Sequence, residues 1–196
     1  MTGVTQAPPC ISVELFRRFL ESRPEKERWE LIDGVAVRME RPTLGHQHVT
    51  QKLQYLLNDA LEIHAPPLTA FLWIGVNTGP SVKMHDPAPD IVVTDSDASE
   101  NPDVRYVDRF YLVAEITSPS DRIHVEKKRG VYKLHETCIC ILTVQQDWIE
   151  VRVDRRTEHG WSEEVLSKPD DFLILPEFGL RCQISNVYRG TALQPR

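Results

Sequence analysis

Two apolar stretches decide the expected fold: Pro89-Asp90-Ile91-Val92-Val93-Thr94 and Tyr111-Leu112-Val113-Ala114-Glu115-Ile116. Continuous apolar runs of this kind are typical of strands that are covered on both faces of a sheet. Asp90 comes directly before the apolar run of the first stretch, and Glu115 lies at the end of the second. As neighbours in one sheet, these strands would bring two carboxylates to the same region.

A helix is expected from about residue 122 to 135, because Ser118-Pro119-Ser120-Asp121 is a turn and helix-start signal. This helix carries Lys127 and Lys128, and the sequence leaves open which of them turns inward. Mg²⁺ prefers oxygen ligands and needs few carboxylates when a substrate phosphate completes its shell. A nearby lysine can orient the attacking water or stabilise the charge on the phosphate. Two carboxylates and an ammonium therefore indicate a metal-dependent phosphodiesterase.

Further helices and strands are expected before and after these segments in the sequence. Their patterns predict a helix over 11–20 with Ser12 as its N-cap, a hairpin over 29–39 with Asp33-Gly34 as its turn, a helix over 46–63, and strands over 70–76, 139–144 and 148–153. The order helix, three strands, helix, strand predicts an α/β (α+β) fold with a mixed central sheet, preceded by the N-terminal helix and the β-hairpin.

Length and composition favour one soluble domain. The chain has 196 residues, 41% of them hydrophobic, so we expect a single domain over 1–196 with a core over about 28–180 and flexible residues 1–10. The N-terminus lacks a basic start and an apolar segment, and the four cysteines lack CxxC pairs. We therefore expect a cytoplasmic protein with reduced cysteines and no membrane association.

Charge bears on the choice of partner. The net charge of −6 weighs against binding of nucleic acid by general electrostatic attraction. A cleft can nevertheless be basic in an acidic protein, and the segment 122–133 concentrates five lysine and arginine residues. A solvated helix face explains that segment equally well.

Several motifs together resemble a known family, the Uma-type family described as "putative restriction endonucleases", which belongs to the PD-(D/E)XK nuclease superfamily. The resemblance extends from Arg28 to the Leu175-Pro176 segment. It is carried by Arg28-Trp29-Glu30-Leu31-Ile32-Asp33-Gly34, His46-Gln47, Pro89-Asp90-Ile91-Val92-Val93, Leu112-Val113-Ala114-Glu115-Ile116, Ser118-Pro119-Ser120, and Lys128 four residues before Tyr132.

The resemblance implies a restriction-endonuclease-like core, with an active site where the second and third core strands diverge. Asp90 and Glu115 would bind Mg²⁺ or Mn²⁺, and the backbone carbonyl of Ile116 would add a ligand. The usual lysine position holds Thr117, so the lysine would come from the following helix as Lys128. Glu30 and His46 fall on family positions that line the same cleft.

The chain also departs from the family pattern. His124 stands where an acidic residue is usual, and residues 138–145 replace an aromatic-rich strand that ends in aspartate. The first hypothesis is a metal-dependent DNA endonuclease with DNA as its substrate and a homodimer as an expected assembly. The alternatives are a catalytically degenerate nuclease-fold module for binding or regulation, and a hydrolase of small phosphorylated molecules, which would need a closed pocket.

Overall fold

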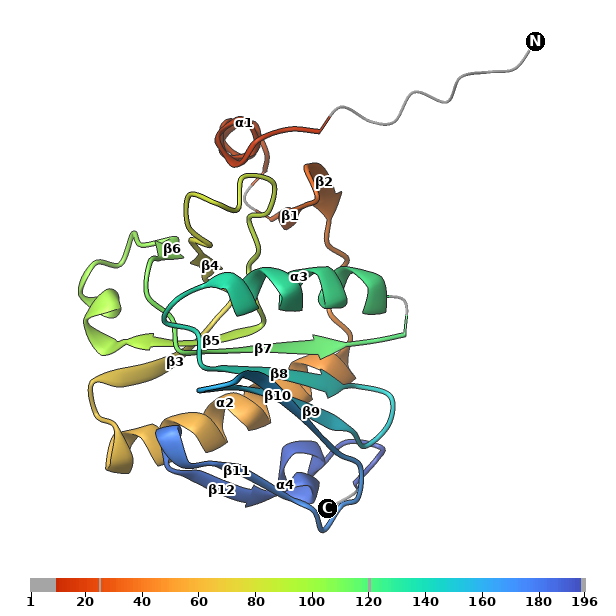
Figure 1. Ribbon diagram of the computed structural model, residues 1–196. Helices are drawn as coiled ribbons and strands as arrows, with labels where there is room; N and C mark the ends of the chain where they lie inside the picture. The colour runs from red at the N-terminus through yellow and green to blue at the C-terminus, as the bar shows by residue number, and fades with distance from the viewer. Residues whose placement is uncertain (1–9, 25, 120, 195–196) are drawn as a thin grey trace.

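A six-stranded mixed sheet lies at the centre of the computed structural model, which describes residues 10–24, 26–119 and 121–194 (Figure 1). Across the sheet the strands are β10 (Gly160–Leu166), β9 (Val151–Thr157), β8 (Cys140–Gln145), β7 (Leu112–Thr117), β5 (Ile91–Asp95) and β3 (Leu68–Leu72). β7 and β8 run parallel, and the other neighbouring pairs are antiparallel. The predicted mixed sheet is confirmed.

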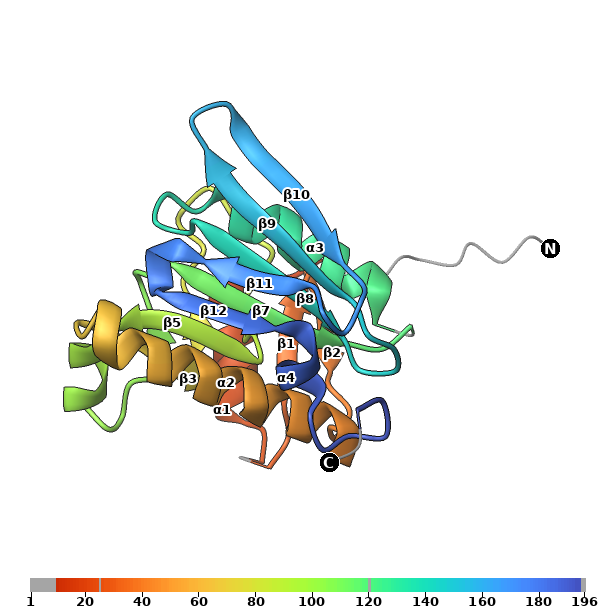
Figure 2. The same cartoon turned by 90° about the horizontal axis from the view of Figure 1, so that it is seen from below.

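Two helices cover the two faces of this sheet (Figures 1 and 2). Helix α2 (Leu44–His64) packs on one face through four buried residues spaced four apart, namely Val49, Leu53, Leu57 and Leu61. Helix α3 (Arg122–Leu134) covers the other face. Ile91 and Val93 of β5 pack with α2, whereas Val92 lies in the cluster that contains Tyr132 of α3. Burial on both faces explains why the central strands are apolar throughout.

Smaller elements flank the two layers (Figure 1). On the α3 side lie α1 (Val13–Glu21), the hairpin of β1 (Trp29–Ile32) and β2 (Val35–Arg38), and the parallel pair of β4 (Gly75–Val76) and β6 (Tyr106–Val107). On the α2 side lie β11 (Phe172–Leu175), β12 (Leu180–Gln183) and α4 (Ile184–Tyr188). Short 3₁₀ turns span Ser96–Glu100 and Pro176–Phe178.

The N-terminal predictions are confirmed in detail. The Ser12 hydroxyl caps α1 by accepting a hydrogen bond from the Leu15 N–H at 3.3 Å. Asp33 and Gly34 both adopt left-handed backbone angles, with φ of 51° and 75°, as a two-residue hairpin turn requires. The chain thus enters the sheet region through the helix and hairpin that the sequence indicated.

Two predicted strands are wrong in their extent. The strand expected over 148–153 is observed as β9, which begins at Val151 and continues to Thr157. The expected strand over 70–76 stops at Leu72, because Trp73 has a left-handed backbone with φ of 52° and turns the chain. Gly75 and Val76 then pair with β6 instead of continuing along β5. The bend aims the Trp73 side chain at the end of β5, where the candidate site lies.

Several expectations concern the chain as a whole. The four cysteines are free, with Cys10 exposed and the other three buried. Among the described residues, no helix is long and apolar enough to cross a membrane. The expected flexibility of residues 1–10 falls, apart from Cys10, outside the described residues. The extent of the single domain and of its core stays a prediction.

Candidate active site

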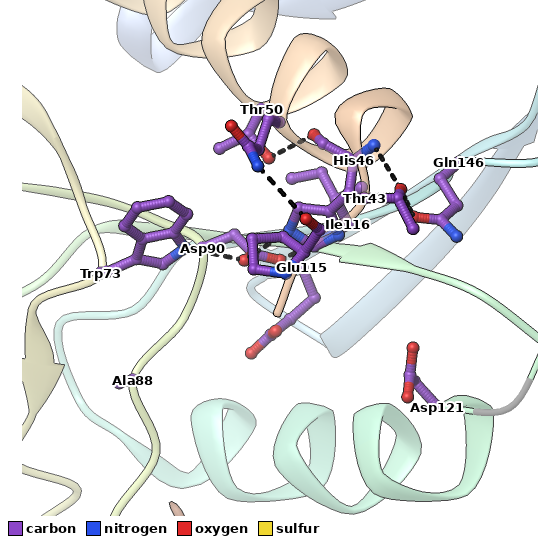
Figure 3. A network of polar contacts seen from close by, with 12 residues as sticks. Thr43, His46, Thr50, Trp73, Ala88, Asp90, Glu115, Ile116, Asp121 and Gln146 are labelled. Carbon is purple, nitrogen blue, oxygen red and sulfur yellow. Dashed lines mark hydrogen bonds and ion pairs between the residues drawn. The ribbon is translucent and has the colours of Figure 1, made fainter. Parts of the chain in front are cut away.

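The candidate site lies where β5 and β7 stop pairing. Their ladder consists of three residue pairs and ends at Ile91 opposite Ala114. Asp90 and Glu115 hold the next positions beyond that last pair. The Glu115 side chain contacts α3, whereas the Asp90 side chain contacts His46 at the start of α2. In Figure 3, Glu115 points from β7 toward α3 and Asp90 lies beside it at the end of β5. The end of the β5–β7 ladder thus leaves the two acidic residues near one another.

Asp90 is held by three groups from different parts of the chain (Figure 3). His46 Nε2 lies 2.9 Å from Oδ1, the indole N–H of Trp73 donates to the same oxygen at 3.0 Å, and the backbone N–H of Ile116 donates to Oδ2 at 2.8 Å. Burial by itself raises the pKa of Asp90, but the contacts with His46 and Ile116 outweigh it and leave this pKa below its ordinary value. Asp90 is therefore an oriented carboxylate anion.

Glu115 is held by two residues of α3. Lys128 Nζ donates to Oε2 at 2.8 Å, and the Tyr132 hydroxyl donates to Oε1 at 2.6 Å. Glu30, on β1, approaches the same ammonium, with its Oε2 3.1 Å from Lys128 Nζ. Glu30, Glu115 and Lys128 are all buried. The β1 hairpin, the sheet and α3 thus converge on one cluster of charges.

The cluster holds more negative than positive charge. Burial raises the pKa of Glu115, and the charges of Glu30 and Asp90 raise it further, while Lys128 acts in the opposite direction. Burial would lower the pKa of Lys128, but Glu115 and Glu30 outweigh burial and raise it above its ordinary value. Lys128 is therefore an ammonium that faces several carboxylates. A divalent cation would offset the remaining negative charge.

The donor set suits a hard divalent ion. Glu30 Oε2 is buried and accepts no hydrogen bond among the described residues, although Lys128 Nζ lies nearby. In the described part of the chain, no three histidine, cysteine or acidic side chains already form a metal cage. Mg²⁺ does not need such a cage, because it keeps several waters and takes substrate oxygens beside one or two carboxylates. Asp90 and Glu115 fit that requirement.

The structure distinguishes the two candidate lysines. Lys128 has only 3% of its surface exposed and contacts Glu115, whereas the Lys127 side chain is 43% exposed and pairs with Asp33 at 2.5 Å. Thr117, at the position where the superfamily usually has lysine, is buried and donates a hydrogen bond to the Ser118 carbonyl. Lys128 therefore supplies the ammonium beside Glu115 from α3.

The site residues expected from the sequence fall into two neighbouring sets of contacts. Lys128 joins Glu115 to Glu30, and Asp90 contacts His46. Ile116 contributes its backbone N–H to Asp90, and the ligand role of its carbonyl stays a prediction. The chemical roles assigned to these side chains likewise stay predictions.

Sequence reasoning missed two residues whose side chains contact the carboxylates. Tyr132 lies four residues after Lys128, and this spacing places both side chains on one face of a helix, so the signal was available. Trp73 gave no such signal, because its contact with Asp90 depends on the chain bend after β3.

Tyr132→Phe is expected to lower the free energy of unfolding by about 1.5–3 kcal/mol, because a buried charged acceptor loses its hydroxyl donor. Urea denaturation of the variant and the wild type measures the difference. Tyr55→Phe is the matched control, since Tyr55 is 64% exposed on α2, and it should change stability by less than about 0.5 kcal/mol. Equal stability of Tyr132→Phe and the wild type would contradict the assigned hydrogen bond.

Thr43→Ala is expected to lower the free energy of unfolding by about 1 kcal/mol. Thr43 is the N-cap of α2, and its hydroxyl accepts a hydrogen bond from the backbone N–H of His46 at 3.1 Å. Thr43→Ser keeps the cap and should retain most of the stability. Thermal unfolding of both variants checks the prediction, which fails if the serine variant loses as much stability as the alanine variant.

Comparisons with known proteins identify the family of the chain and a solved structure of similar fold. A family model described as "Uma2: Putative restriction endonuclease" matches residues 13–185. A crystal structure described as a "putative nuclease belonging to DUF820", from Anabaena variabilis ATCC 29413, is similar with a TM-score of 0.71 and 20% identity, over 88% of this chain and 96% of that one. No match is found among curated proteins. The resemblance seen in the sequence is confirmed, and the chain belongs to the Uma2 family of "putative restriction endonucleases".

Proposed function

We propose that the protein is a divalent-metal-dependent nuclease that hydrolyses phosphodiester bonds of DNA. The observation that carries the proposal is the arrangement of Asp90 and Glu115 on adjacent strands with Lys128 bonded to Glu115. Membership of the Uma2 family and the likeness to a nuclease-fold structure support it. Mg²⁺ or Mn²⁺ is the proposed cofactor, held by Asp90 and Glu115.

Each residue of the site has a distinct proposed task. When bound, the metal ion would polarise a phosphoryl oxygen and lower the pKa of a water molecule. Lys128 is held as an ammonium, so it acts as a donor that positions the phosphate or the attacking water and not as a base. His46 orients Asp90, and Tyr132 orients Glu115. The chain thus supplies fixed charges around the phosphate.

A cleavage assay tests the proposal directly. Purified protein is incubated with supercoiled plasmid and with labelled oligonucleotides in Mg²⁺, in Mn²⁺ and in EDTA. We expect cleavage with either metal and none in EDTA. Intact DNA under every condition would contradict a nuclease and would favour the alternative, a degenerate module for binding or regulation.

Metal binding gives a separate prediction. At a Mg²⁺ or Mn²⁺ concentration of about 100 times the dissociation constant, the folded protein should gain about 2.7 kcal/mol of stability, because the ion binds the native state. Differential scanning calorimetry measures the accompanying rise in melting temperature. Glu115→Gln should abolish most of that rise. A rise of the same size in this variant would place the ion elsewhere.

The proposal includes two further expectations, one on the location of the protein in the cell and one on its assembly. We expect a cytoplasmic location, which fractionation of cells tests. We also expect a homodimer, because one site per chain cuts one strand at a time. Analytical ultracentrifugation with and without duplex DNA tests the dimer, and a monomer under both conditions would contradict it.

A further inference from the structure

A cleft adjoins the candidate active site. It has a volume of about 410 Å³ and is lined by four partly exposed aromatic side chains, Trp29, Phe71, Trp73 and Tyr106. Phe71 pairs with Val92 in the sheet register, and the backbone N–H of Trp73 donates to the Asp90 carbonyl at 3.3 Å. Phe71 and Trp73 therefore come from the strand segment next to β5, on the side of Asp90.

Two lining residues bond directly to carboxylates of the site. The Trp73 indole N–H donates to Asp90 Oδ1, and the Ala88 backbone N–H donates to Glu30 Oε1 at 3.3 Å. Trp73, labelled beside Asp90 in Figure 3, reaches this position at the cost of a left-handed backbone. A group that occupies the cleft is therefore separated from the carboxylates of the proposed reaction centre by a single lining residue.

The far wall of the cleft is fixed in place. The Tyr106 hydroxyl donates to Asp86 Oδ2 at 3.1 Å, and the Arg17 guanidinium lies 3.9 Å from the centre of the Tyr106 ring. Gly75 leaves room for that ring, since a Cβ there would lie 2.4 Å from it. The aromatic wall is thus ordered before any ligand arrives, which lowers the entropic cost of stacking a flat group against it.

Positive charge borders the aromatic surface. Arg105 lines the cleft and is exposed, and the exposed Arg28 places its guanidinium 3.6 Å from the centre of the Trp73 ring. Aromatic rings beside arginines are the combination that binds single-stranded nucleic acid, where bases stack on the rings and phosphates meet the cations. In a paired duplex the base faces are covered by their neighbours, so a paired base cannot use this surface.

We propose that this cleft binds an unstacked base of the substrate strand, next to the phosphate that is cleaved. The inference rests on the proposed nuclease function, which supplies the strand, and it narrows the substrate class to single-stranded or locally unpaired nucleic acid. Trp73 is then a positioning residue, because it contacts both the base and Asp90. The acidic net charge of the whole chain does not decide this, since Arg105 and Arg28 lie beside the aromatic rings, with Asp86 in the same lining.

Tryptophan fluorescence tests the proposal. Of the four tryptophans, Trp29 and Trp73 line the cleft, so the double variant Trp148→Phe/Trp161→Phe reports on the cleft alone. Its fluorescence is titrated in EDTA with a single-stranded 12-mer, the same sequence as a perfect duplex, a single strand made only of abasic sites, and a free nucleoside monophosphate. We expect quenching by the base-containing single strand, with an affinity at least about tenfold above that for the duplex and the abasic strand.

Substitutions of residues that line the cleft test whether the fluorescence change arises from binding there. Phe71→Leu keeps apolar volume but removes a stacking face, and it should weaken binding of the single strand by about fivefold to a hundredfold. Tyr55→Leu removes an exposed aromatic residue on α2 and should leave binding unchanged. If Phe71→Leu does not fold, Arg105→Ala on the exposed rim provides the same test through a loss of affinity for the single strand.

The outcomes separate this inference from the nuclease proposal. Equal affinity for single strand, duplex and abasic strand, or quenching by the free nucleotide alone, would overturn the cleft assignment. Cleavage of the labelled single strand in Mg²⁺ is measured on the same preparations. Cleavage without quenching would overturn the proposal that the cleft binds a base, and it would support the proposed nuclease activity. Quenching without cleavage would support base binding in the cleft and would count against nuclease activity.

Discussion

Lys128→Met is expected to lower the free energy of unfolding by about 3–5 kcal/mol, because it leaves the buried carboxylates of Glu115 and Glu30 without their counter-charge. The methionine fills much of the same volume, so lost packing contributes little to the effect. Urea denaturation in EDTA measures the change. The variant should also cleave DNA poorly, since no ammonium faces the phosphate.

The neighbouring lysine provides the control for this prediction. Lys127→Met removes a charge that is partly exposed and paired with Asp33 at the surface, so it should cost less than about 1 kcal/mol. Mg²⁺ should restore more stability to Lys128→Met than to Lys127→Met, because a cation can replace the missing ammonium. Equal losses in the two variants would contradict the burial and pairing assigned to Lys128.

Asp90→Asn is expected to reduce cleavage of DNA by about a thousandfold or more, because it removes a carboxylate proposed to hold the metal ion. The amide also fits its surroundings poorly. His46 and Trp73 approach Oδ1 and the Ile116 N–H donates to Oδ2, whereas an amide has a single acceptor oxygen. The variant should therefore lose about 1–3 kcal/mol of stability as well.

Asp97→Asn is the matched control for Asp90→Asn. Asp97 is exposed and follows β5 at the end opposite Asp90, so the same chemical change there should affect neither cleavage nor stability. Initial rates on a labelled oligonucleotide, measured at saturating Mg²⁺, compare the two variants with the wild type. Wild-type cleavage by Asp90→Asn would remove Asp90 from the reaction.

Much of the fold could be predicted because its elements have strong local signals. The runs at 91–93 and 112–114 are apolar throughout, and a strand buried on both faces gives that pattern. Asp33-Gly34 specified its turn, and the apolar spacing of α2 specified its buried face. The second half of the sheet was less visible, because β10 is largely exposed and mostly polar, and it is positioned by pairing with β9.

The positions of site residues could be predicted where they depend on which strands are neighbours in the sheet. Asp90 and Glu115 lie near one another because their strands pair as neighbours and the ladder ends beside them, and this follows once the two strands are identified. The choice between Lys127 and Lys128 could not be settled from their sequence positions alone, since it depends on the rotation of α3 about its axis. The contact of Trp73 with Asp90 depends on a left-handed residue that apolar patterning does not reveal.

Anomalous X-ray diffraction from crystals soaked in MnCl₂ tests the central claim most directly, because it locates the ion without reference to activity. The account predicts a manganese peak in contact with the carboxylates of both Asp90 and Glu115, and no such peak in crystals of Glu115→Gln. Manganese bound only at other residues, or no peak at a saturating concentration, would contradict the account.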